Sequence, residues 1–479
     1  MKILVLSSNA RGYGGFFSGV AADLRDKYGH EVIMASENRL SDYLDGVNYF
    51  DGEAVYASDF VSQLDATIDV PDNFPSDELS GTTLVDLDRV EEFRTFSDST
   101  RLLLEIMPKR YLSFLLHLFA RFKFDAVVFE GVSSTFGYVA YLVCRYYSVP
   151  FIGLSGARLP GRSEIHDGLQ GIGADLKFIY ENIDLGFISQ EEADYIENYL
   201  KNFFSVQLDY MKGNALLVEA PFWRRYFSLS KLRIFAGLLS YQINYAKKDL
   251  TLFQTGSPVR FAARMLSRAV GRRIRLSRVE KLYDSLESVK NCYYLYPLHF
   301  HPESSTSVGS PDYINEYEVI RRIASQLPDG TMLVVKDHRS AAGFPSFDFY
   351  RRLKHIPNVR LLHYSCDTKA LIKDCLAVVT LTSTVGHEAL VMGKSVILLG
   401  EVFYKYHPDC HQIKSISEFG PKARQLRASI QNSNGIDNEK IRKYLLTYFR
   451  HTFPGVIKLD GSRPDISFAR AVNDFLRKS

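Results

Sequence analysis

The sequence predicts an α/β protein with two doubly wound, Rossmann-type domains that face a central cleft. Short, almost continuously apolar runs bounded by turn residues recur along the chain, which is typical of parallel strands covered on both faces. Helix-like stretches separate these runs in both halves of the chain. Because the 479 residues exceed what one hydrophobic core usually serves, we expect two domains.

The apolar runs and the stretches between them place the expected elements. The expected strands are 2–7, 31–35, 126–129 and 150–154 in the first half, and 292–298, 331–336, 359–362, 377–381 and 395–399 in the second. The expected helices are 16–28, 136–147, 313–327, 368–374 and 385–392. Strand and helix therefore alternate in each half, as they do in βαβ units.

Changes in this pattern divide the chain into four expected segments. Residues 1–188 and 289–435 form the two Rossmann-like domains. Residues 189–288 are mostly helical in pattern and connect the domains. Residues 436–479 are expected to form helices that pack back across the first domain.

Composition excludes several classes of protein. The formal net charge of +3 is too small to indicate nucleic-acid binding. The five cysteines form no CxxC pair, so we expect neither a disulfide framework nor a structural zinc site, and a cytoplasmic location fits best. The apolar run at the N-terminus is too short for a signal peptide, and no stretch approaches the roughly 20 apolar residues of a spanning helix. Any membrane contact is therefore expected to be peripheral.

The connector ends in a basic segment, residues 260–281. This segment is either a solvated helix face or interdomain connector, or a patch that holds the protein near anionic lipid or a phosphorylated lipid-linked acceptor. The second reading would place the protein at the inner face of the plasma membrane. The cations of the segment are Arg260, Arg264, Arg268, Arg272, Arg273, Arg275, Arg278 and Lys281.

A glycine-rich loop follows the first expected strand. It contains Arg11, Gly12 and Gly14 and leads into a helix, so backbone N–H groups there could face a ligand. The loop is not a GxGxxG motif, which disfavours nicotinamide binding. A tight strand–helix turn and a ligand-facing loop both remain open readings.

A carboxylate ends the expected strand 126–129. Glu130 is followed by glycine and by small polar residues that include Ser133. Ligands of open α/β sheets gather at the carboxyl ends of the strands, where a desolvated carboxylate gains a raised pKa and can act as a general base. The alternative is that Glu130 caps the following helix.

Two further strand ends carry polar side chains. His299, His301 and Glu303 follow the strand 292–298 together with three hydroxyl residues, and such groups can bind phosphate or sugar oxygens. Their spacing does not fit a metal site, so no metal is expected. Lys336 ends the strand 331–336, His338 follows it, and both suit a phosphate. A polar loop and a solvent-facing strand end are the respective alternatives.

The most specific block runs from strand 377–381 to strand 395–399. The first strand leads to Thr382, Ser383 and Thr384 at the start of a helix, where backbone N–H groups, hydroxyls and the helix dipole can together cradle a phosphate. Glu388 lies one turn further on the same face and could reach a ribose hydroxyl. Taken alone, a Ser/Thr helix cap is common.

At this block the sequence resembles the C-terminal domain of GT-B glycosyltransferases, and more narrowly the capsule polysaccharide biosynthesis proteins that include bacterial Kdo transferases. The resemblance covers roughly 292–405. The Glu130-Gly131 pair looks like the acid–glycine element of nucleotide-sialic-acid and Kdo transferases. The matching runs are Tyr296-Pro297-Leu298-His299-Phe300-His301-Pro302-Glu303, Val335-Lys336-Asp337-His338 and Thr382-Ser383-Thr384-Val385-Gly386-His387-Glu388-Ala389.

This resemblance implies a metal-independent GT-B enzyme without a cofactor. Its first domain would bind a glycan or lipid-linked acceptor, and its second would bind a CMP- or UDP-linked sugar, with Kdo or a related acidic sugar as the candidate. Glu130 would act in acid/base catalysis, and His338 with Lys336 would stabilise the departing phosphate. The implied donor-site residues are His301, Glu303, Thr382, Ser383, Thr384 and Glu388, and the candidate acceptor or loop residues are Arg11, Gly12, Gly14 and Ser133.

Two other functions stay open at this point. A nucleotide-sugar epimerase of the same architecture would act on the free nucleotide sugar without an acceptor. A non-catalytic scaffold would use a degenerate transferase fold in a polysaccharide assembly complex. The basic segment 260–281 does not discriminate between an enzyme and a scaffold.

Overall fold

A computed structural model describes residues 1–61, 70–92, 95–169, 174–206, 228–246, 249–254, 256–290, 292–430 and 437–478. The chain divides into two compact units. The first comprises Met1–Leu169, Gln207–Leu266 and Thr452–Ser479, and the second comprises Gln170–Val206 and Ser267–His451.

These units differ from the four expected segments. The expected connector 189–288 is shared between the two units. The expected C-terminal helices also separate: α20 (Asn438–His451) packs on α8 (Ala174–Asn182) and α9 (Gln190–Asn202) in the second unit, whereas α21 (Ile466–Lys478) packs on α1 (Tyr13–Tyr28) in the first. The periodicity of a helix reveals an apolar face but not the surface that covers it. The expected boundary at 435 lies outside the described residues.

The first unit is built on a seven-stranded sheet in the order β13-β6-β5-β4-β1-β2-β3. The strands from β3 to β5 are parallel, and β6 and β13 extend that edge in the antiparallel sense. Their bounds are β1 (Lys2–Ser7), β2 (Glu31–Ser36), β3 (Ala54–Tyr56), β4 (Ala126–Phe129), β5 (Phe151–Gly156), β6 (Arg162–His166) and β13 (Thr452–Pro454).

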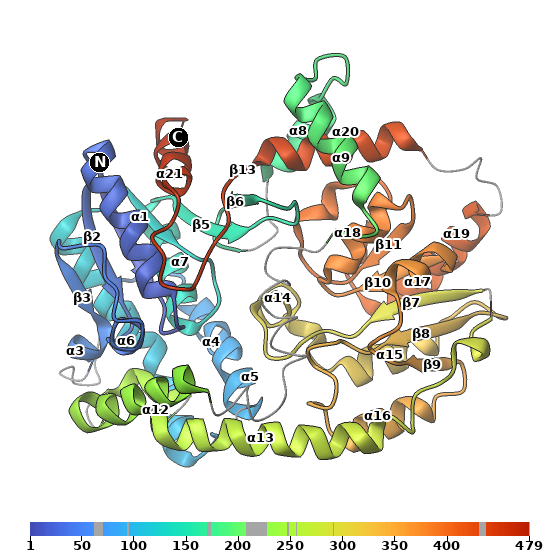
Figure 1. Ribbon diagram of the computed structural model, residues 1–479, viewed down its shortest axis with the longest axis horizontal. Coiled ribbons are helices and arrows are strands. Elements are labelled where there is room, and N and C mark those ends of the chain that lie inside the picture. Colours follow the sequence, from blue (N-terminus) through green and yellow to red (C-terminus); the bar gives the residue numbers. More distant parts are fainter. Residues whose placement is uncertain are drawn as a thin grey trace. The chain divides into compact units, whose positions relative to one another are not determined.

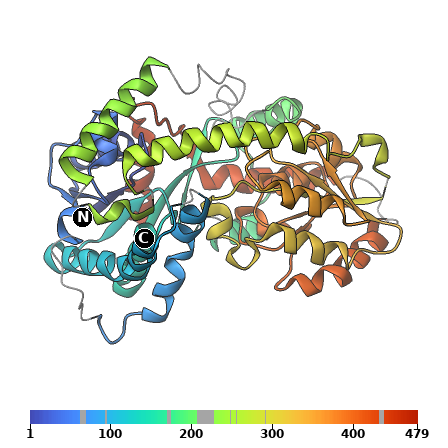
Figure 2. The same ribbon diagram turned by 90° about the horizontal axis from the view of Figure 1, so that it is seen from below.

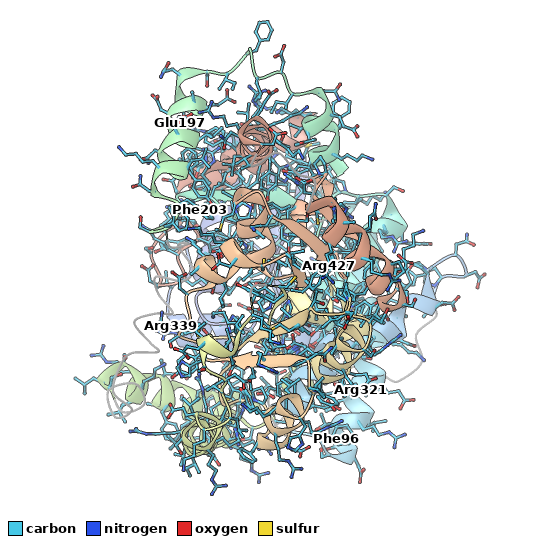
Figure 3. All side chains as sticks on the ribbon, turned by 90° about the vertical axis from the view of Figure 1, so that its right-hand side faces the viewer. Phe96, Glu197, Phe203, Arg321, Arg339 and Arg427 are labelled. Atoms are coloured by element: carbon cyan, nitrogen blue, oxygen red, sulfur yellow. The ribbon has the colours of Figure 1, made fainter. Side chains whose placement is uncertain are left out.

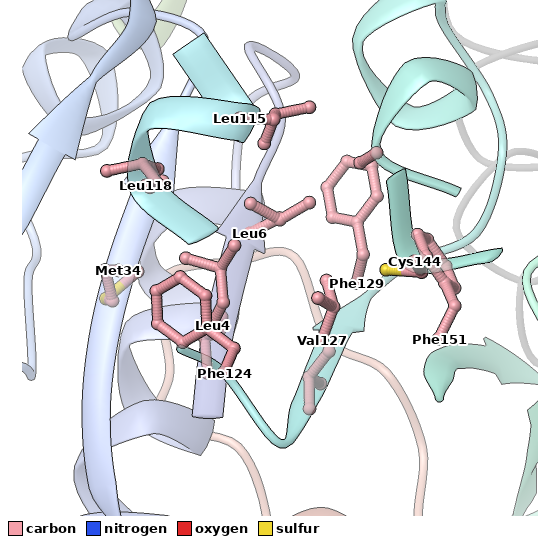
Figure 4. Packing of buried hydrophobic residues seen from close by; sticks show 14 of the residues in the cluster. Leu4, Leu6, Met34, Leu115, Leu118, Phe124, Val127, Phe129, Cys144 and Phe151 are labelled. Atoms are coloured by element: carbon pink, nitrogen blue, oxygen red, sulfur yellow. The ribbon is translucent and has the colours of Figure 1, made fainter. Parts of the chain in front are cut away.

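Helices cover both faces of this sheet, because right-handed crossovers in opposite directions place helices on opposite faces. The helix α1 lies beside α21 on one face (Figure 1). On the other face, Leu115 and Leu118 of a long helix pack against Leu4, Leu6 and Met34 (Figure 4). The remaining helices are α2 (Leu40–Asp45), α3 (Ala57–Val61), α4 (Leu79–Thr82), α5 (Leu84–Glu92), α6 (Asp98–Phe122), α7 (Thr135–Tyr147) and α12 (Leu229–Tyr241).

The second unit holds a six-stranded, fully parallel sheet in the order β12-β11-β10-β7-β8-β9. Read from β9, this is the 3-2-1-4-5-6 order of Rossmann folds, with the strand order reversing between β7 and β10. The strands are β7 (Tyr293–Pro297), β8 (Met332–Lys336), β9 (Val359–Leu362), β10 (Ala377–Thr380), β11 (Ser395–Leu398) and β12 (Cys410–Gln412).

Some helices of the second unit lie between these strands along the chain, and others precede β7 or follow β12. One of them, α13, contains the boundary between the two units, which falls after Leu266. Besides α8, α9 and α20, they are α13 (Pro258–Val279), α14 (Ser304–Ser307), α15 (Glu316–Ala324), α16 (Phe347–Lys354), α17 (Thr368–Asp374), α18 (Thr384–Val391) and α19 (Phe419–Ile430).

The doubly wound α/β class expected from the sequence is confirmed in each unit. Every expected strand and helix is present to within a few residues. The sequence did not indicate the short strands β3, β6, β12 and β13 or the 25-residue helix α6. Among the described residues, no helix is both long and apolar enough to cross a bilayer.

Candidate active site

The carboxyl ends of β7 and β10 meet at the switch point of the second sheet, where His299 joins them. Its Nε2 lies 3.3 Å from the backbone nitrogen of Thr382 and 3.2 Å from Oγ1 of Thr380. Because the Thr382 N–H donates to Nε2, a neutral His299 carries its proton on Nδ1, which lies 2.8 Å from Oε1 of Glu316. The imidazole therefore fixes the loop after β10 relative to the end of β7.

Glu316, at the start of α15, is a buried carboxylate that holds this imidazole. It also accepts hydrogen bonds from the Tyr296 hydroxyl and the His299 backbone N–H, both at 3.1 Å, and lies 3.4 Å from Nε2 of His301. Burial alone would raise its pKa, but the charges and hydrogen bonds of His299 and His301 outweigh burial and lower the pKa to about 2. Sequence reasoning missed Glu316, because an acid in the first turn of a helix is common.

The three hydroxyl residues expected to cradle a phosphate lie at the start of α18. Ser383 caps this helix, since its Oγ accepts from the Val385 backbone N–H at 3.2 Å. The Ser383 backbone N–H in turn donates to Oγ1 of Thr380 at 3.0 Å. The cap reading of Ser383 is therefore correct, and its backbone is held by the strand that precedes it.

Two buried hydroxyls at this strand end have no hydrogen-bond partner in the described parts of the chain: Oγ1 of Thr382 and Oγ of Ser310. The loops that carry them are packed together. A Cβ built on Gly309 would lie 3.1 Å from Cγ2 of Thr382, and one built on Gly400 would lie 2.9 Å from Cβ of Ser310. Since buried polar groups are nearly always hydrogen-bonded, these hydroxyls mark the place where a polar ligand would complete the site.

Other residues of the same block serve the packing of α18. A Cβ on Gly386 would lie 2.3 Å from the hydroxyl oxygen of Tyr404, and that hydroxyl donates to the Ser383 carbonyl at 2.6 Å. His387 is a core residue whose ring nitrogens face the hydroxyls of Tyr199 and Tyr444 at 3.2 and 2.5 Å.

His338 follows β8 in a loop with a defined proton arrangement. The Ser340 backbone N–H lies 3.2 Å from its Nδ1, so Nδ1 accepts and the neutral ring carries its proton on Nε2. Burial, followed by the charges of His299 and Lys336, lowers the pKa of His338 to about 4. The ring is therefore neutral near pH 7 and can donate one hydrogen bond from Nε2.

Arginines of α13 donate hydrogen bonds to backbone carbonyls of this loop. Arg272 donates from Nε to the Ala342 carbonyl at 2.7 Å, and Arg275 donates from Nε to the Gly343 carbonyl at 3.0 Å. The guanidinium groups of Arg268 and Arg272 also lie over the Phe344 ring, at 4.9 and 4.4 Å from its centre. Three of the eight cations of the basic segment therefore pack against the chain itself.

The remaining predicted donor-site residues differ in their surroundings. Lys336 is buried and donates to the Tyr364 carbonyl at 3.1 Å, so its ammonium group is engaged by backbone and the solvent-facing alternative is wrong for it. Glu388 is half-buried, and burial raises its pKa against the opposing charges of Lys369 and Lys336.

In the loop after β7, the two predicted residues His301 and Glu303 differ in burial. His301 is partly buried between Glu316 and Thr306, with its Nδ1 3.4 Å from Oγ1 of Thr306. Glu303 is exposed and accepts from the Ser305 hydroxyl at 3.1 Å. Arg339, labelled in Figure 3, is also exposed, and its carbonyl lies near Arg272.

In the first unit, Glu130 lies at the equivalent switch point, between the carboxyl ends of β1 and β4. The Ser133 hydroxyl donates to its Oε1 at 2.8 Å, and hydroxyls of Tyr13 and Ser8 also hydrogen-bond it. Burial raises the pKa of Glu130 despite these bonds. The helix-cap alternative is wrong, because Ser134 caps α7. Sequence reasoning missed Tyr13, since a tyrosine inside a glycine loop carries no recognised motif.

A second buried acid of the first unit follows β2. Glu37 accepts from the Tyr111 hydroxyl at 2.9 Å and from the Asn9 amide at 2.8 Å. Burial and the charge of buried Asp86 raise the pKa of Glu37 to about 8. Two carboxyl groups with raised pKa values therefore lie at the carboxyl end of the first sheet.

The glycine-rich segment between β1 and α1 packs closely against other parts of the same chain. Gly12 has a φ of 87°, and a Cβ there would lie 2.5 Å from the Leu459 carbonyl oxygen. A Cβ on Gly14 would lie 2.5 Å from Oδ1 of Asp42. The tight-turn reading is therefore supported for Gly12, whereas Gly14 lies in the first turn of α1 and Arg11 is exposed.

Comparison with known proteins identifies part of the chain. A family model described as capsule polysaccharide biosynthesis protein matches residues 251–417. Over residues 251–417 the chain is thus similar to capsule polysaccharide biosynthesis proteins. This capsule-synthesis segment contains the switch point of the second sheet, the His338 loop and the start of α18.

The capsule-synthesis segment also has a curated relative. Protein FixF of Sinorhizobium fredii (strain NBRC 101917 / NGR234) is 28% identical over 167 residues, which are 34% of this chain and 37% of that protein. The match thus spans little more than a third of the relative's length.

Two solved structures are similar to this chain, with low TM-scores and low sequence identity. The beta Kdo 2,4 transferase KpsC of Thermosulfurimonas dismutans has a TM-score of 0.34 at 14% identity and covers 67% of this chain and 79% of its own. A UDP-GlcNAc 2-epimerase from Neisseria meningitidis, bound to UDP-GlcNAc, has a TM-score of 0.28 at 12% identity and covers 100% of both chains. At these scores neither carries a conclusion about this chain.

Proposed function

We propose that the chain is a glycosyltransferase of capsule or related surface polysaccharide biosynthesis, which moves a sugar from a nucleotide-sugar donor to a glycan or lipid-linked acceptor. The observation that carries the proposal is the pair of buried, unpartnered hydroxyls of Thr382 and Ser310 at the switch point of a Rossmann-ordered sheet, where such folds bind nucleotides. The capsule-synthesis segment surrounds this point.

In this proposal the second unit binds the donor nucleotide and stabilises its departure. An acceptor hydroxyl attacks the anomeric carbon, the bond from that carbon to the phosphate oxygen breaks, and the phosphate takes the electron pair. The Nε2–H of His338 and the N-terminal end of α18 would face the charge that develops on the phosphate. A CMP- or UDP-linked donor, carrying Kdo or a related acidic sugar, stays the favoured substrate.

The first unit would supply the base. The carboxylate of Glu130 takes the proton of the attacking hydroxyl, and its raised pKa makes it a stronger base than an ordinary glutamate. The hydroxyls of Tyr13 and Ser133 would hold the carboxylate in one orientation. Glu130 must be ionised for this step, so transfer is expected to rise with pH through its pKa.

Nucleotide binding tests the proposal directly. The full chain is titrated with CMP, UDP, GDP and ADP, and Thr382→Val, which keeps the shape but removes the hydroxyl, should weaken binding of the preferred nucleotide about tenfold. Thr447→Val is the matched control, because Thr447 is buried and already bonded to the Lys443 carbonyl at 2.8 Å.

The outcomes separate the alternatives. Transfer that requires both nucleotide sugar and acceptor supports the proposal. Failure to bind any of the four nucleotides would favour a scaffold, and a sugar product formed without an acceptor would favour an epimerase.

A further inference from the structure

A row of large apolar side chains is exposed along α12 in the first unit. In the views of Figures 1 and 2, α12 lies at the outer edge of its unit. The exposed fractions are 79% for Leu229, 54% for Leu232, 44% for Phe235, 45% for Leu239 and 72% for Ile243, which lies in the π-helical turn η2 (Gln242–Ala246). At about 100° per residue, the four in α12 fall within roughly 120° of the helix circumference. We name these five residues the α12 stripe.

The opposite side of α12 is the one that packs on the protein. Tyr241 is 1% exposed, and its ring centre lies 5.8 Å from that of Tyr43. A Cβ on Gly237 would lie 3.1 Å from Cδ2 of Leu44. The helix is thus anchored by one face, and the α12 stripe is not needed for that packing.

Cations border the α12 stripe. On the helix circumference, Lys231 lies at one edge of the stripe and Arg233 at the other, and both are exposed. Residues 228–248 contain two further lysines, Lys247 and Lys248, and no aspartate or glutamate. An apolar stripe with basic edges is the pattern of helices that lie in the plane of an anionic membrane surface.

We propose that α12 docks the protein on an anionic bilayer, with the α12 stripe in the acyl boundary and Lys231 and Arg233 at the lipid phosphates. Long basic side chains can lie along apolar surface while their charges stay in the headgroup layer. This places the membrane contact on α12, whereas three arginines of the basic segment 260–281 are engaged by the His338 loop.

A second copy of the chain fits the α12 stripe less well. Pairing two stripes would bring the basic edges of two helices together, and residues 228–248 offer no acidic side chain to offset them. Anionic lipid, by contrast, neutralises each basic edge, at about 1 kcal/mol per charge near the surface.

Vesicle flotation with the full chain tests the inference, and it requires no measurement of enzymatic activity. On vesicles of equal parts phosphatidylglycerol and phosphatidylcholine, Leu232→Ser with Leu239→Ser should lower partitioning at least about tenfold. Lys231→Gln with Arg233→Gln should lower it about tenfold on these vesicles and leave the weak binding to pure phosphatidylcholine unchanged.

Matched controls come from α6 of the same unit, where Arg101 and Leu102 are both exposed. Leu102→Ser and Arg101→Gln should bind like wild type, and melting temperatures of all variants should agree because the changed side chains are exposed. Equal binding by stripe variants and wild type, or no binding by wild type, would overturn the proposal. So would a wild-type dimer that the stripe variants convert to a monomer. Normal vesicle binding by Glu130→Gln keeps this result separate from the catalytic proposal.

Discussion

The two sheets share the order of their central parallel strands, yet the side chains at their switch points differ in chemistry. In the first unit, Glu130 and Glu37 are carboxyls whose pKa values are raised by burial. In the second, Glu316 is an ionised carboxylate that holds His299, and His338 is a neutral imidazole. The same backbone arrangement thus presents a proton acceptor in one unit and hydrogen-bond donors in the other.

This difference shows that fold and site chemistry are set separately. The strand order decides where polar side chains can gather, because only the carboxyl ends at a switch point are left open by the crossovers. Burial and neighbouring charges then decide which of those side chains are ionised. Changes to single titratable groups in each unit test this difference.

Glu130→Gln should have the largest effect. Loss of a general base typically costs about a hundredfold to ten-thousandfold in rate, so kcat should fall by that amount while nucleotide affinity, assigned to the second unit, stays the same. Steady-state kinetics and calorimetric titration measure the two quantities. The control is Glu31→Gln, because Glu31 is exposed at the start of β2, away from the carboxyl ends of the strands. A kcat near that of wild type would remove Glu130 from the mechanism.

Glu37→Gln tests the buried acids of the first unit through stability. The pKa of Glu37 rises from 4.5 to about 8 on folding, so the folded state holds a proton that the unfolded state loses. Its contribution to stability is therefore complete below pH 4.5 and is lost as pH rises towards 8, by roughly 3–5 kcal/mol. Urea unfolding at several pH values should show this loss in wild type and not in the variant. Parallel pH profiles would contradict the assignment.

Glu316→Gln addresses the second unit. An amide cannot balance His299 and His301 as the carboxylate does, so the free energy of unfolding at pH 7 should fall by about 2–3 kcal/mol. Chemical denaturation measures this change. Glu318→Gln on the same helix removes an exposed ion pair with Arg321 and should cost less than about 1 kcal/mol. Equal effects of the two changes would mean that Glu316 does not organise the site.

His338 gives the smallest expected effect. With a pKa near 4, its ring should show no titration between pH 5 and pH 8 in NMR spectra of the free protein. His338→Ala should weaken nucleotide binding by about tenfold, the value of roughly one hydrogen bond to a charged group. A titration midpoint between pH 6 and 7 would show that the ring is solvated and not held as the structure indicates.

Much of the candidate site was readable from sequence. Glu130, His338 and the Thr382–Thr384 run were predicted because they directly follow apolar strands, and chain order alone places them at the carboxyl ends. Glu316 and Tyr13 were not, because they lie on helices and reach the site through side chains. Glu303 was predicted to line the donor pocket, and its side chain is exposed; its role stays a prediction, since a loop position does not specify a direction.

Hydrophobic periodicity and turn residues act over a few neighbouring positions, so the alternation of strands and helices, the two sheets and the residues that end their strands could be predicted from the sequence. The packing of α20 and α21 in different units, the binding of three α13 arginines to the loop after β8 and the exposed apolar stripe of α12 could not. Those outcomes depend on contacts between residues far apart in the chain, and local patterns carry no record of which surface a helix face meets.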